Sequence, residues 1–420
     1  MRILIGISGG IAAYKVCNVV RLLKEQGHEV QVCATENALR FVGSATLEAL
    51  SGKPLANSVF SGVDKVAHVS TGRNADLVII APATADLLFK VAHGAGSDLL
   101  STACLVATCP IILAPAMHTE MWTKPAVMDN VATMRARGIT VLDPAHGRLT
   151  GADEGTGRLL EPDQITAFGQ LIAEGYTLPR DLEGKHVVIT AGGTVEDIDP
   201  VRFISNRSSG KQGFALAEVA SQRGARVTLI CGEVDRRLSK PANTDIVNVR
   251  SATQMNEAVV STMRSKTVDM LIMAAAVADY HPESRSLTKL KKNGADGLSI
   301  PLAQNPDILA GVCANRADYA HKETGKEPLI VGFAAETGDD NHSVLDYAKM
   351  KLEKKGCDLL MVNQIGSSKS GVQAISEVFG SNVNSGWILS QKGGEPLRLN
   401  EGSKMAIASQ ILDAAVAYRD

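Results

Sequence analysis

The sequence has 420 residues, enough for two or three domains that each bury a core. Hydrophobic residues make up 45% and charged residues 21%, and 43 Lys and Arg against 45 Asp and Glu give a formal charge of −2. This near balance, together with only 4% aromatic residues, argues against nucleic acid as a partner, because little positive charge or stacking surface is available for it.

Cysteine usage and apolar segments bear on the cellular compartment. The seven cysteines are an odd number and form no C-x-x-C motif, which is typical of free thiols in a reducing environment. No apolar stretch approaches the roughly 18–20 residues that cross a bilayer, and Ser8 interrupts the apolar run that follows Arg2. We therefore expect a cytoplasmic protein with no membrane partner.

The first half alternates apolar runs with amphipathic segments. RILIGI, at residues 2–7, ends in small residues, and apolar residues then repeat at helical spacing from Val16 until Gly27. Further strands are expected at residues 28–35, 77–82 and 109–117. Because Val and Ile occupy both faces of these strands, the pattern predicts a parallel sheet that is covered by helices on both sides.

The same pattern restarts after the polar segment EGYTLPRDLEGK, near residue 180. GKHVVITAGGT predicts a strand and a Gly-rich turn, and a helix follows around residues 210–223. The segments 281–297 and 365–373 are expected to be loops. Four later strands are expected, at residues 225–232, 268–276, 328–337 and 357–363. We therefore predict an α/β protein with two Rossmann-like domains, at residues 1–178 and 182–420, of which the first is flavodoxin-like.

Neither Gly-rich turn matches a common phosphate-binding fingerprint. G-x-G-x-x-G fails because Ser8 and Ile11 follow Gly6, and NRSSGK is no P-loop because Ser205 and Gln212 stand at required positions. Backbone amides of a small-residue turn at a helix start still favour an anion. The two turns therefore suggest two phosphorylated ligands, although the first is equally compatible with a tight connection that binds nothing.

Several strings in order resemble a known pair of enzymes. In the first half these strings are GISGGIAAYK, His68 in VAHVST, ADLVIIAPATAD and PAMHTEMW, and they resemble FMN-dependent cysteine decarboxylases. In the second half they are TAGGTVEDIDPVRFISNRSSGKQG, AAVADY, KLKK, NPDIL and VGFAAET, and they resemble phosphopantothenate–cysteine ligase. The order and length are similar to those of the bifunctional coenzyme A biosynthesis family, over nearly the whole chain.

The resemblance implies two consecutive reactions. In the ligase half, CTP activates 4′-phosphopantothenate as an acyl-cytidylate with loss of pyrophosphate, and the amine of cysteine then forms an amide. In the decarboxylase half, FMN oxidises the thiol end of this product to a thioaldehyde, CO₂ leaves, and the hydride returns to give 4′-phosphopantetheine. The implied cofactors are FMN and Mg²⁺ or Mn²⁺, with CTP as co-substrate.

The ligase chemistry concentrates negative charge, so its site needs cations, backbone donors and a metal ion. By resemblance, Asn206 turns over the acyl-cytidylate and Lys289 acts in catalysis. Lys351 and Lys355 stand at i, i+4 of an expected helix, which taken alone indicates a solvated face. The residues that the resemblance assigns to CTP are Met273, Ala274, Ala275, Asp279, Lys289, Pro306, Asp307, Ile308, Leu309, Phe333, Lys351 and Lys355.

In the decarboxylase half, His68 matches the catalytic histidine of the family, although an isolated histidine beside an apolar segment is more often structural. The residues that the resemblance assigns to FMN are Ser8, Gly9, Thr35, Ala83 and Thr84.

Two positions depart from the family pattern. His118 stands where the family has an Asn that contacts the substrate carboxylate, and we expect His118 to donate in its place. The substrate flap, HGRLTGADEGTGR, lacks the family's cysteine that returns a proton in the last step. Thr150 is the nearest match, and a hydroxyl is a far weaker acid than a thiol. The proton donor and the metal ligands are therefore unassigned.

Two alternatives remain at this point, a two-domain pyridine-nucleotide oxidoreductase and a non-enzymatic flavoprotein regulatory subunit. The missing glycine fingerprints weigh against the first, and the complete set of ligase strings weighs against the second. The resemblance also implies a homo-oligomer, with trimeric decarboxylase contacts and dimeric ligase contacts that together make a dodecamer.

Overall fold

A computed structural model describes residues 1–56, 72–151, 153–291, 298–339, 341–364 and 381–419. The chain forms two compact units, Met1–Leu178 and Pro179–Asp420. Among the described residues, no helix has both the length and the apolar character to cross a bilayer.

The first unit is built on a five-stranded sheet in the order β2-β1-β3-β4-β5, and all neighbours pair in parallel. This is the flavodoxin-like order, in which the chain reverses direction across the sheet between β1 and β3. Its strands are β1 (Arg2–Ile7), β2 (Glu29–Ala34), β3 (Leu77–Ala83), β4 (Ile111–Pro115) and β5 (Thr140–Val141), with a separate hairpin of β6 (Ala145–Arg148) and β7 (Glu154–Arg158).

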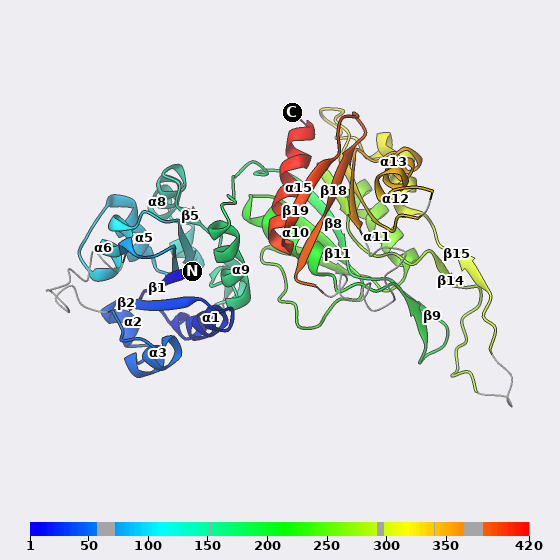
Figure 1. The fold of residues 1–420 in the computed structure, drawn as a ribbon. Helices are drawn as coiled ribbons and strands as arrows, with labels where there is room; N and C mark the ends of the chain where they lie inside the picture. The colour runs from blue at the N-terminus through cyan, green and yellow to red at the C-terminus, as the bar shows by residue number, and fades with distance from the viewer. Residues whose placement is uncertain (57–71, 152, 292–297, 340, 365–380, 420) are drawn as a thin grey trace. The chain divides into compact units, whose positions relative to one another are not determined.

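Helices cover both faces of this sheet (Figure 1). One face carries α5, α6 and α8, whose apolar side chains pack on Leu4, Val78 and Ile80, and the other carries α1 and α9. All seven residues of β3 are buried, as a doubly covered strand requires. The helices are α1 (Ala13–Glu25), α2 (Glu36–Leu39), α3 (Ser44–Ser51), α5 (Ala85–His93), α6 (Leu99–Val106), α7 (Thr119–Trp122), α8 (Pro125–Ala136) and α9 (Pro162–Ala173).

The second unit has an eight-stranded sheet in the order β12-β11-β8-β13-β16-β17-β18-β19. The first six strands of that order pair in parallel, and β18 and β19 add an antiparallel edge. These strands are β8 (His186–Ala191), β11 (Arg226–Cys231), β12 (Thr244–Asn248), β13 (Met270–Met273), β16 (Leu329–Glu336), β17 (Leu359–Gln364), β18 (Val383–Ser390) and β19 (Leu397–Ser403). The predicted α/β class, with parallel sheets flanked by helices, is confirmed for both units.

Helices again lie on both faces of the sheet. The face formed in part by Val188, Leu271 and Leu360 packs against α11, α12 and α13, whereas α10 and α15 pack together on the opposite face (Figure 1). Serine caps explain two of these helix starts, because Ser251 and Ser343 each accept a hydrogen bond from the third residue of the helix that follows. The helices are α10 (Lys211–Gln222), α11 (Ala252–Ser265), α12 (Ile308–Ala314), α13 (Val344–Lys355) and α15 (Lys404–Arg419).

The structure contains two short hairpins that the sequence analysis did not predict, because it identified strands by their long apolar runs. They pair β9 (Val195–Asp197) with β10 (Phe203–Ser205) and β14 (Tyr280–Pro282) with β15 (Leu302–Gln304). The segment 281–297, expected to be a loop, therefore begins inside a strand. These strands are only three residues long and alternate little, which leaves no periodic signal. The expected loop at 365–373 lies outside the described residues.

A buried arginine ties the start of the second unit to its core. Arg223, whose side chain is 1% exposed, donates from Nε to Asp181 at 2.9 Å and from a terminal nitrogen to Asp413 at 2.6 Å. Asp181 follows the unit boundary and Asp413 lies on α15, so one guanidinium connects three segments that are far apart in the sequence. Its planar fork suits two carboxylates at once.

We expect Arg223→Ala to lower the free energy of unfolding of the second unit by about 3–5 kcal/mol, because it leaves a cavity and two unpaired carboxylates. Calorimetric unfolding of the full chain measures this. Arg237→Ala serves as control, since that side chain is 89% exposed beside Asp235 and should change stability by less than about 0.5 kcal/mol. Equal effects of the two substitutions would contradict this account.

Candidate functional site

The five residues assigned to FMN meet at the carboxyl edge of the first sheet. Ser8 and Gly9 follow β1, Thr35 follows β2, and Ala83 and Thr84 end and follow β3. The Ser8 hydroxyl donates to the Pro82 carbonyl at 2.6 Å and accepts from the Thr84 amide at 3.0 Å. Ser8 therefore links the ends of two neighbouring strands at the point where the strand order reverses, where open parallel sheets bind ligands.

Two helix starts near this edge have no side-chain cap. Helix α5 begins after Thr84 and α1 begins after Ala12, and neither of these residues accepts a hydrogen bond from the first turn of its helix. In α1, however, the Ala13 and Lys15 amides already donate to the Gly10 and Ala12 carbonyls, at 3.0 and 3.1 Å. The start of α5 is therefore the better place for an anion. Thr35 differs, because its hydroxyl already accepts from the Ala38 amide at 3.3 Å and caps the short helix α2.

His118 lies beyond the next strand of the same sheet. It follows β4 and precedes α7, and its Nδ1 is 3.1 Å from Oδ2 of Asp153. Asp153 and Thr150 both belong to the turn between β6 and β7. The predicted catalytic residue His68 lies outside the described residues, so its position relative to this group stays a prediction.

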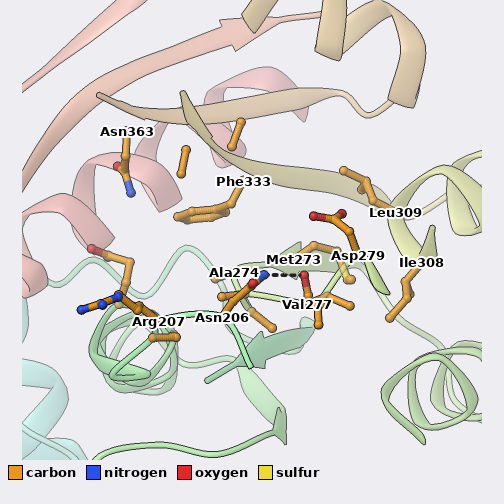
Figure 2. A pocket seen from close by; sticks show the side chains of 18 of the residues that line it. Asn206, Arg207, Met273, Ala274, Val277, Asp279, Ile308, Leu309, Phe333 and Asn363 are labelled. Atoms are coloured by element: carbon orange, nitrogen blue, oxygen red, sulfur yellow. Dashed lines mark hydrogen bonds between the residues drawn. The ribbon is translucent and has the colours of Figure 1, made fainter. Parts of the chain in front are cut away.

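The second unit has a cavity of about 550 Å³ at the carboxyl edge of its own sheet. It opens between the ends of β13, β16 and β17 and the start of α10 (Figure 2). The predicted residues that line it are Asn206, Met273, Ala274, Ala275, Asp279, Pro306, Asp307, Ile308, Leu309, Phe333, Lys351 and Lys355. Lys289 does not line it: its neighbour Leu290 donates its amide to Asp199, next to the hairpin of β9 and β10.

The NRSSGK segment forms one wall of this cavity. The Asn206 amide group donates to the Val277 carbonyl at 2.9 Å and so joins this wall to the segment after β13 (Figure 2). Gly210 then starts α10 with a φ of 75°, and a Cβ there would lie 2.3 Å from a Val234 methyl group. Only glycine accepts both this conformation and this close approach, which explains the motif's last glycine.

The two predicted lysines of α13 are paired with carboxylates. Lys351 contacts Glu336 at 2.7 Å, and Lys355 contacts Asp307, which also caps α12 by accepting from the Ala310 amide. Burial would raise the pKa of Asp307, but these two donors outweigh it and lower the pKa below its usual value. The face is therefore a half-buried charged wall of the cavity, not the solvated face that spacing alone indicates.

Ten further polar residues line the cavity and were not identified from the sequence as site residues: Arg207, Ser208, Ser209, Lys211, Gln212, Gln304, Asn305, Asn363, Asn384 and Lys404. Burial and the neighbouring charge of Lys211 lower the pKa of Lys404 to about 8. The Asn363 side-chain oxygen is buried and makes no hydrogen bond within the described residues. The first seven of these lie in or next to the NRSSGK and NPDIL strings. Asn363, Asn384 and Lys404 carried no motif or spacing signal, because β17, β18 and α15 bring them in from the end of the chain.

Acidic groups are sparse in this part of the molecule. Among the described residues, no three His, Cys, Asp or Glu side chains are grouped to hold a metal ion. Within the cavity lining, the carboxylates are Asp279 and Asp307, and Asp307 is already paired with Lys355. Of these two carboxylates, Asp279 is therefore the one that, among the described residues, is not paired with a lysine.

Comparison with known proteins assigns both halves. Residues 1–171 match the family described as "Flavoprotein", and residues 182–418 match the "DNA/pantothenate metabolism flavoprotein C-terminal domain". The coenzyme A biosynthesis bifunctional protein CoaBC of Mycobacterium tuberculosis (strain ATCC 25618 / H37Rv) is 52% identical over 418 residues, which cover 99% of this chain and 96% of that protein. These matches support neither of the two alternatives considered above.

Solved structures are similar to each half separately. The C-terminal domain of a coenzyme A biosynthesis bifunctional protein CoaBC is 33% identical and covers 57% of this chain and 97% of its own, with a TM-score of 0.43. The FMN-dependent cysteine decarboxylase SpaF is 31% identical and covers 41% and 97%, with a TM-score of 0.37.

The family follows from two findings. One relative is more than half identical along nearly the entire chain, and both family models match, one in each half of the chain. The chain belongs to the family of bifunctional coenzyme A biosynthesis proteins.

Proposed function

We propose that residues 182–420 ligate 4′-phosphopantothenate with cysteine at the expense of CTP, and that residues 1–178 decarboxylate the product to 4′-phosphopantetheine. The chain is a bifunctional enzyme of coenzyme A biosynthesis with ligase and decarboxylase activities. Each activity therefore belongs to one unit and is performed by residues of that unit.

The observation that carries the ligase assignment is the distribution of charge along one cavity. At one end of the cavity lie Asp279 and the two lysines of α13, Lys351 and Lys355. At the other end Lys211 and Lys404 lie beside the start of α10. Two neighbouring lysines in a partly dry cavity repel each other, and a bound dianion would relieve this repulsion. We assign this lysine end to the phosphate of 4′-phosphopantothenate and the other end to CTP.

This division places the reacting groups between the two ends. Activation joins the carboxylate of one substrate to the α-phosphate of the other, so the bond must form between the two ends. Asn206 stands between them, because its bond to Val277 joins the segment that leads to α10 with the segment that leads to Asp279. Asn206 is held by its bond to Val277, and the second N–H of its amide group can donate to the acyl carbonyl. Met273, Ala274 and Ala275 are small or flexible, which lets the nucleotide approach the backbone, and Phe333 offers a flat apolar surface to the cytosine ring.

The cavity also suits a magnesium or manganese ion. Mg²⁺ is usually held by one or two protein carboxylates together with substrate phosphates, so a cluster of three acidic side chains is not required. Asp279 would supply the carboxylate. The ion would neutralise charge on the triphosphate and on the departing pyrophosphate.

The first unit suits FMN. The uncapped start of α5 offers amides to the phosphate, and Ser8 holds the Thr84 amide in place at the sheet edge. Gly9 is required at this turn, because a Cβ there would lie 2.4 Å from the Cβ of Asn37. When bound, FMN would supply the two-electron oxidation of the substrate thiol and its reversal. We assign His68 to the handling of the substrate beside the flavin, as expected from the sequence.

Subunit contacts complete the proposal. Val201, Phe203, Tyr280 and Leu302 are large apolar side chains on the two short hairpins of the second unit, and each is about half exposed in the single chain. Such a patch is typical of a subunit interface. We propose that it forms the dimeric ligase contact, from which Lys289 would act, and that trimeric decarboxylase contacts complete a cytoplasmic dodecamer.

Replacing Asn206 tests the ligase assignment. We expect Asn206→Asp to form acyl-cytidylate and pyrophosphate but to slow amide formation by about 10²-fold, because a carboxylate repels the developing charge on the acyl carbonyl. Mass spectrometry of 4′-phosphopantothenate, cysteine and CTP reaction mixtures measures both species. The exposed Asn400→Asp, outside the cavity, should behave as wild type, and a wild-type protein that never releases CMP would refute the ligase function.

The lysine end predicts a dependence on pH. Lys404 should be charged below its pKa of about 8 and lose its charge above it, so the KM for 4′-phosphopantothenate should rise as the pH increases through 8. The uncharged Lys404→Gln should have a raised KM already at pH 7 and a flatter profile. Steady-state kinetics between pH 7 and about 9.5 measure this. A profile that is unchanged by the substitution would remove Lys404 from the phosphate site.

We expect flavin binding to depend on the Ser8 hydroxyl, which bonds to both the Pro82 carbonyl and the Thr84 amide. We expect Ser8→Ala to raise the Kd for FMN by about tenfold, because loss of one hydrogen bond frees the Thr84 amide from its position. Flavin fluorescence during titration of the flavin-free protein gives the Kd. Ser44→Ala, on the exposed start of α3, is the control. A protein that stays colourless after incubation with FMN would exclude the decarboxylase assignment.

A further inference from the structure

Decarboxylation has a requirement that the proposed FMN residues do not meet. When CO₂ leaves a carbon atom, the electron pair of the broken bond stays on that carbon, which must then take a proton. Water can supply this proton, but a side chain that gives up a proton beside the flavin would deliver it faster. The turn between β6 and β7 holds no cysteine, and the hydroxyl of Thr150 is too weak an acid for this role.

His118 is placed at the same sheet edge as the flavin residues. It follows β4 by three residues, and β4 pairs with β3 up to the contact between Ala83 and Pro115. The Ala116 amide donates to the Ala83 carbonyl at 3.2 Å and continues this contact toward His118. Half of the His118 side chain is exposed in the single chain, so a substrate that reaches this edge can contact its ring.

Asp153 holds the imidazole of His118 from the other side. The 3.1 Å contact between Nδ1 and Oδ2 uses the nitrogen nearer the backbone. The other carboxylate oxygen of Asp153 accepts from the Gly151 amide at 3.1 Å, which keeps the carboxylate in its turn. Hydrogen bonds from backbone amides, more than the nearby His118, lower the pKa of Asp153, so it is an ionised acceptor near neutral pH. With Nδ1 donating to Asp153, the proton that the imidazolium can give to the substrate is the one on Nε2, and the ring that remains is the Nδ1–H tautomer.

Two glycines of β7 set the position of the hairpin over His118. A Cβ on Gly157 would lie 2.0 Å from the Met117 carbonyl oxygen, and one on Gly155 would lie 2.1 Å from the Thr119 hydroxyl. The Met117 amide donates to the Gly157 carbonyl at 2.9 Å. The strand therefore packs directly on the residues on either side of His118. The Thr119 hydroxyl is buried here and has no hydrogen-bond partner within the described part of the chain.

We propose that His118, oriented by Asp153, delivers the proton to the carbon that has lost CO₂. His118 is the catalytic residue and Asp153 is a positioning residue. The inference rests on the proposed decarboxylase function of residues 1–178, and it explains why the two departures from the family pattern, the histidine at 118 and the flap without cysteine, occur together in one chain.

The step is balanced in atoms and electrons. Loss of CO₂ from the thioaldehyde leaves an enethiolate, C=C–S⁻. The Nε2–H bond of the imidazolium breaks, a C–H bond forms at the former carboxyl-bearing carbon, and the electron pair of the sulfur closes a C=S bond. The two electrons that were removed from the thiol carbon then return to that carbon as hydride, and the sulfur takes a proton from solvent. The ring is left as the Nδ1–H tautomer and regains its proton from water.

The test separates carbon dioxide release from proton delivery. Flavin-loaded full-length wild type, His118→Gln and Asp153→Asn are mixed anaerobically with 4′-phosphopantothenoylcysteine, and CO₂ and both thiol products are quantified. We expect CO₂ release in the first turnover to stay within about threefold of wild type, because the side-chain amide that His118→Gln introduces can still donate a hydrogen bond to the substrate carboxylate, whereas it cannot deliver a proton. Formation of the saturated thiol should fall by about 10²-fold in His118→Gln, with the enethiol accumulating, and by a smaller factor in Asp153→Asn.

A second readout needs neither flavin nor turnover. In flavin-free protein with ¹⁵N-labelled histidine, the His118 ring should be in the Nδ1–H tautomer in wild type and in a mixture of tautomers in Asp153→Asn; His118→Gln identifies the signal. His146→Gln is the matched control, because that exposed histidine lies on the same hairpin, and it should leave product ratios and the His118 signal unchanged.

Three results would overturn the assignment. If the two substitutions abolish CO₂ release while the wild type retains it, His118 and Asp153 act in substrate binding or in the decarboxylation step itself. If the ratio of saturated thiol to enethiol is unchanged, the proton comes from elsewhere. If the wild type itself releases no CO₂, the decarboxylase function of this unit fails, and the role of His118 fails with it.

Discussion

Parallel pairing of strands is the constraint on which both candidate sites depend. A parallel sheet brings the carboxyl ends of its strands to one edge, so residues that follow different strands become neighbours there however far apart they lie in the sequence. In the first unit this edge collects Ser8, Thr84 and His118 from the ends of three strands. In the second it collects Asn206, Asp279 and Phe333 around one cavity. The same backbone pattern thus serves two unrelated reactions.

Charge then distinguishes the two edges. The first offers the uncapped start of α5 and one bridging hydroxyl, an arrangement that suits a single phosphate. The second adds four lysines, two of them paired with carboxylates and two adjacent to each other, which suits two separate polyanions. The lowered pKa of Lys404 follows from this crowding, because burial and a like charge both disfavour its protonated form.

The hairpin of β6 and β7 lacks the family's cysteine, and its packing brings another residue to the position where a proton donor is needed. Its two glycines allow it to lie directly against residues 117–119, and this contact brings Asp153 to His118. An acid that is absent from the turn itself is thereby supplied by a neighbouring strand end. Lys351 and Lys355 are similar, since their partners Glu336 and Asp307 come from other elements and convert an apparently solvated helix face into a cavity wall.

The amino-acid sequence by itself determined the α/β class and the parallel strands, because buried parallel strands are continuous apolar runs. It also identified many residues that line the cavity of the second unit, because compact motifs such as NRSSGK and NPDIL carry them. Only the tertiary structure decided which distant polar groups join those motifs. Lys404, Asn363 and Asn384 enter the cavity through a sheet order that no local pattern encodes, and Asp153 reaches His118 only because a hairpin packs on the loop after β4. Periodicity reports which face of an element is buried, whereas contacts between elements depend on how the sheets assemble.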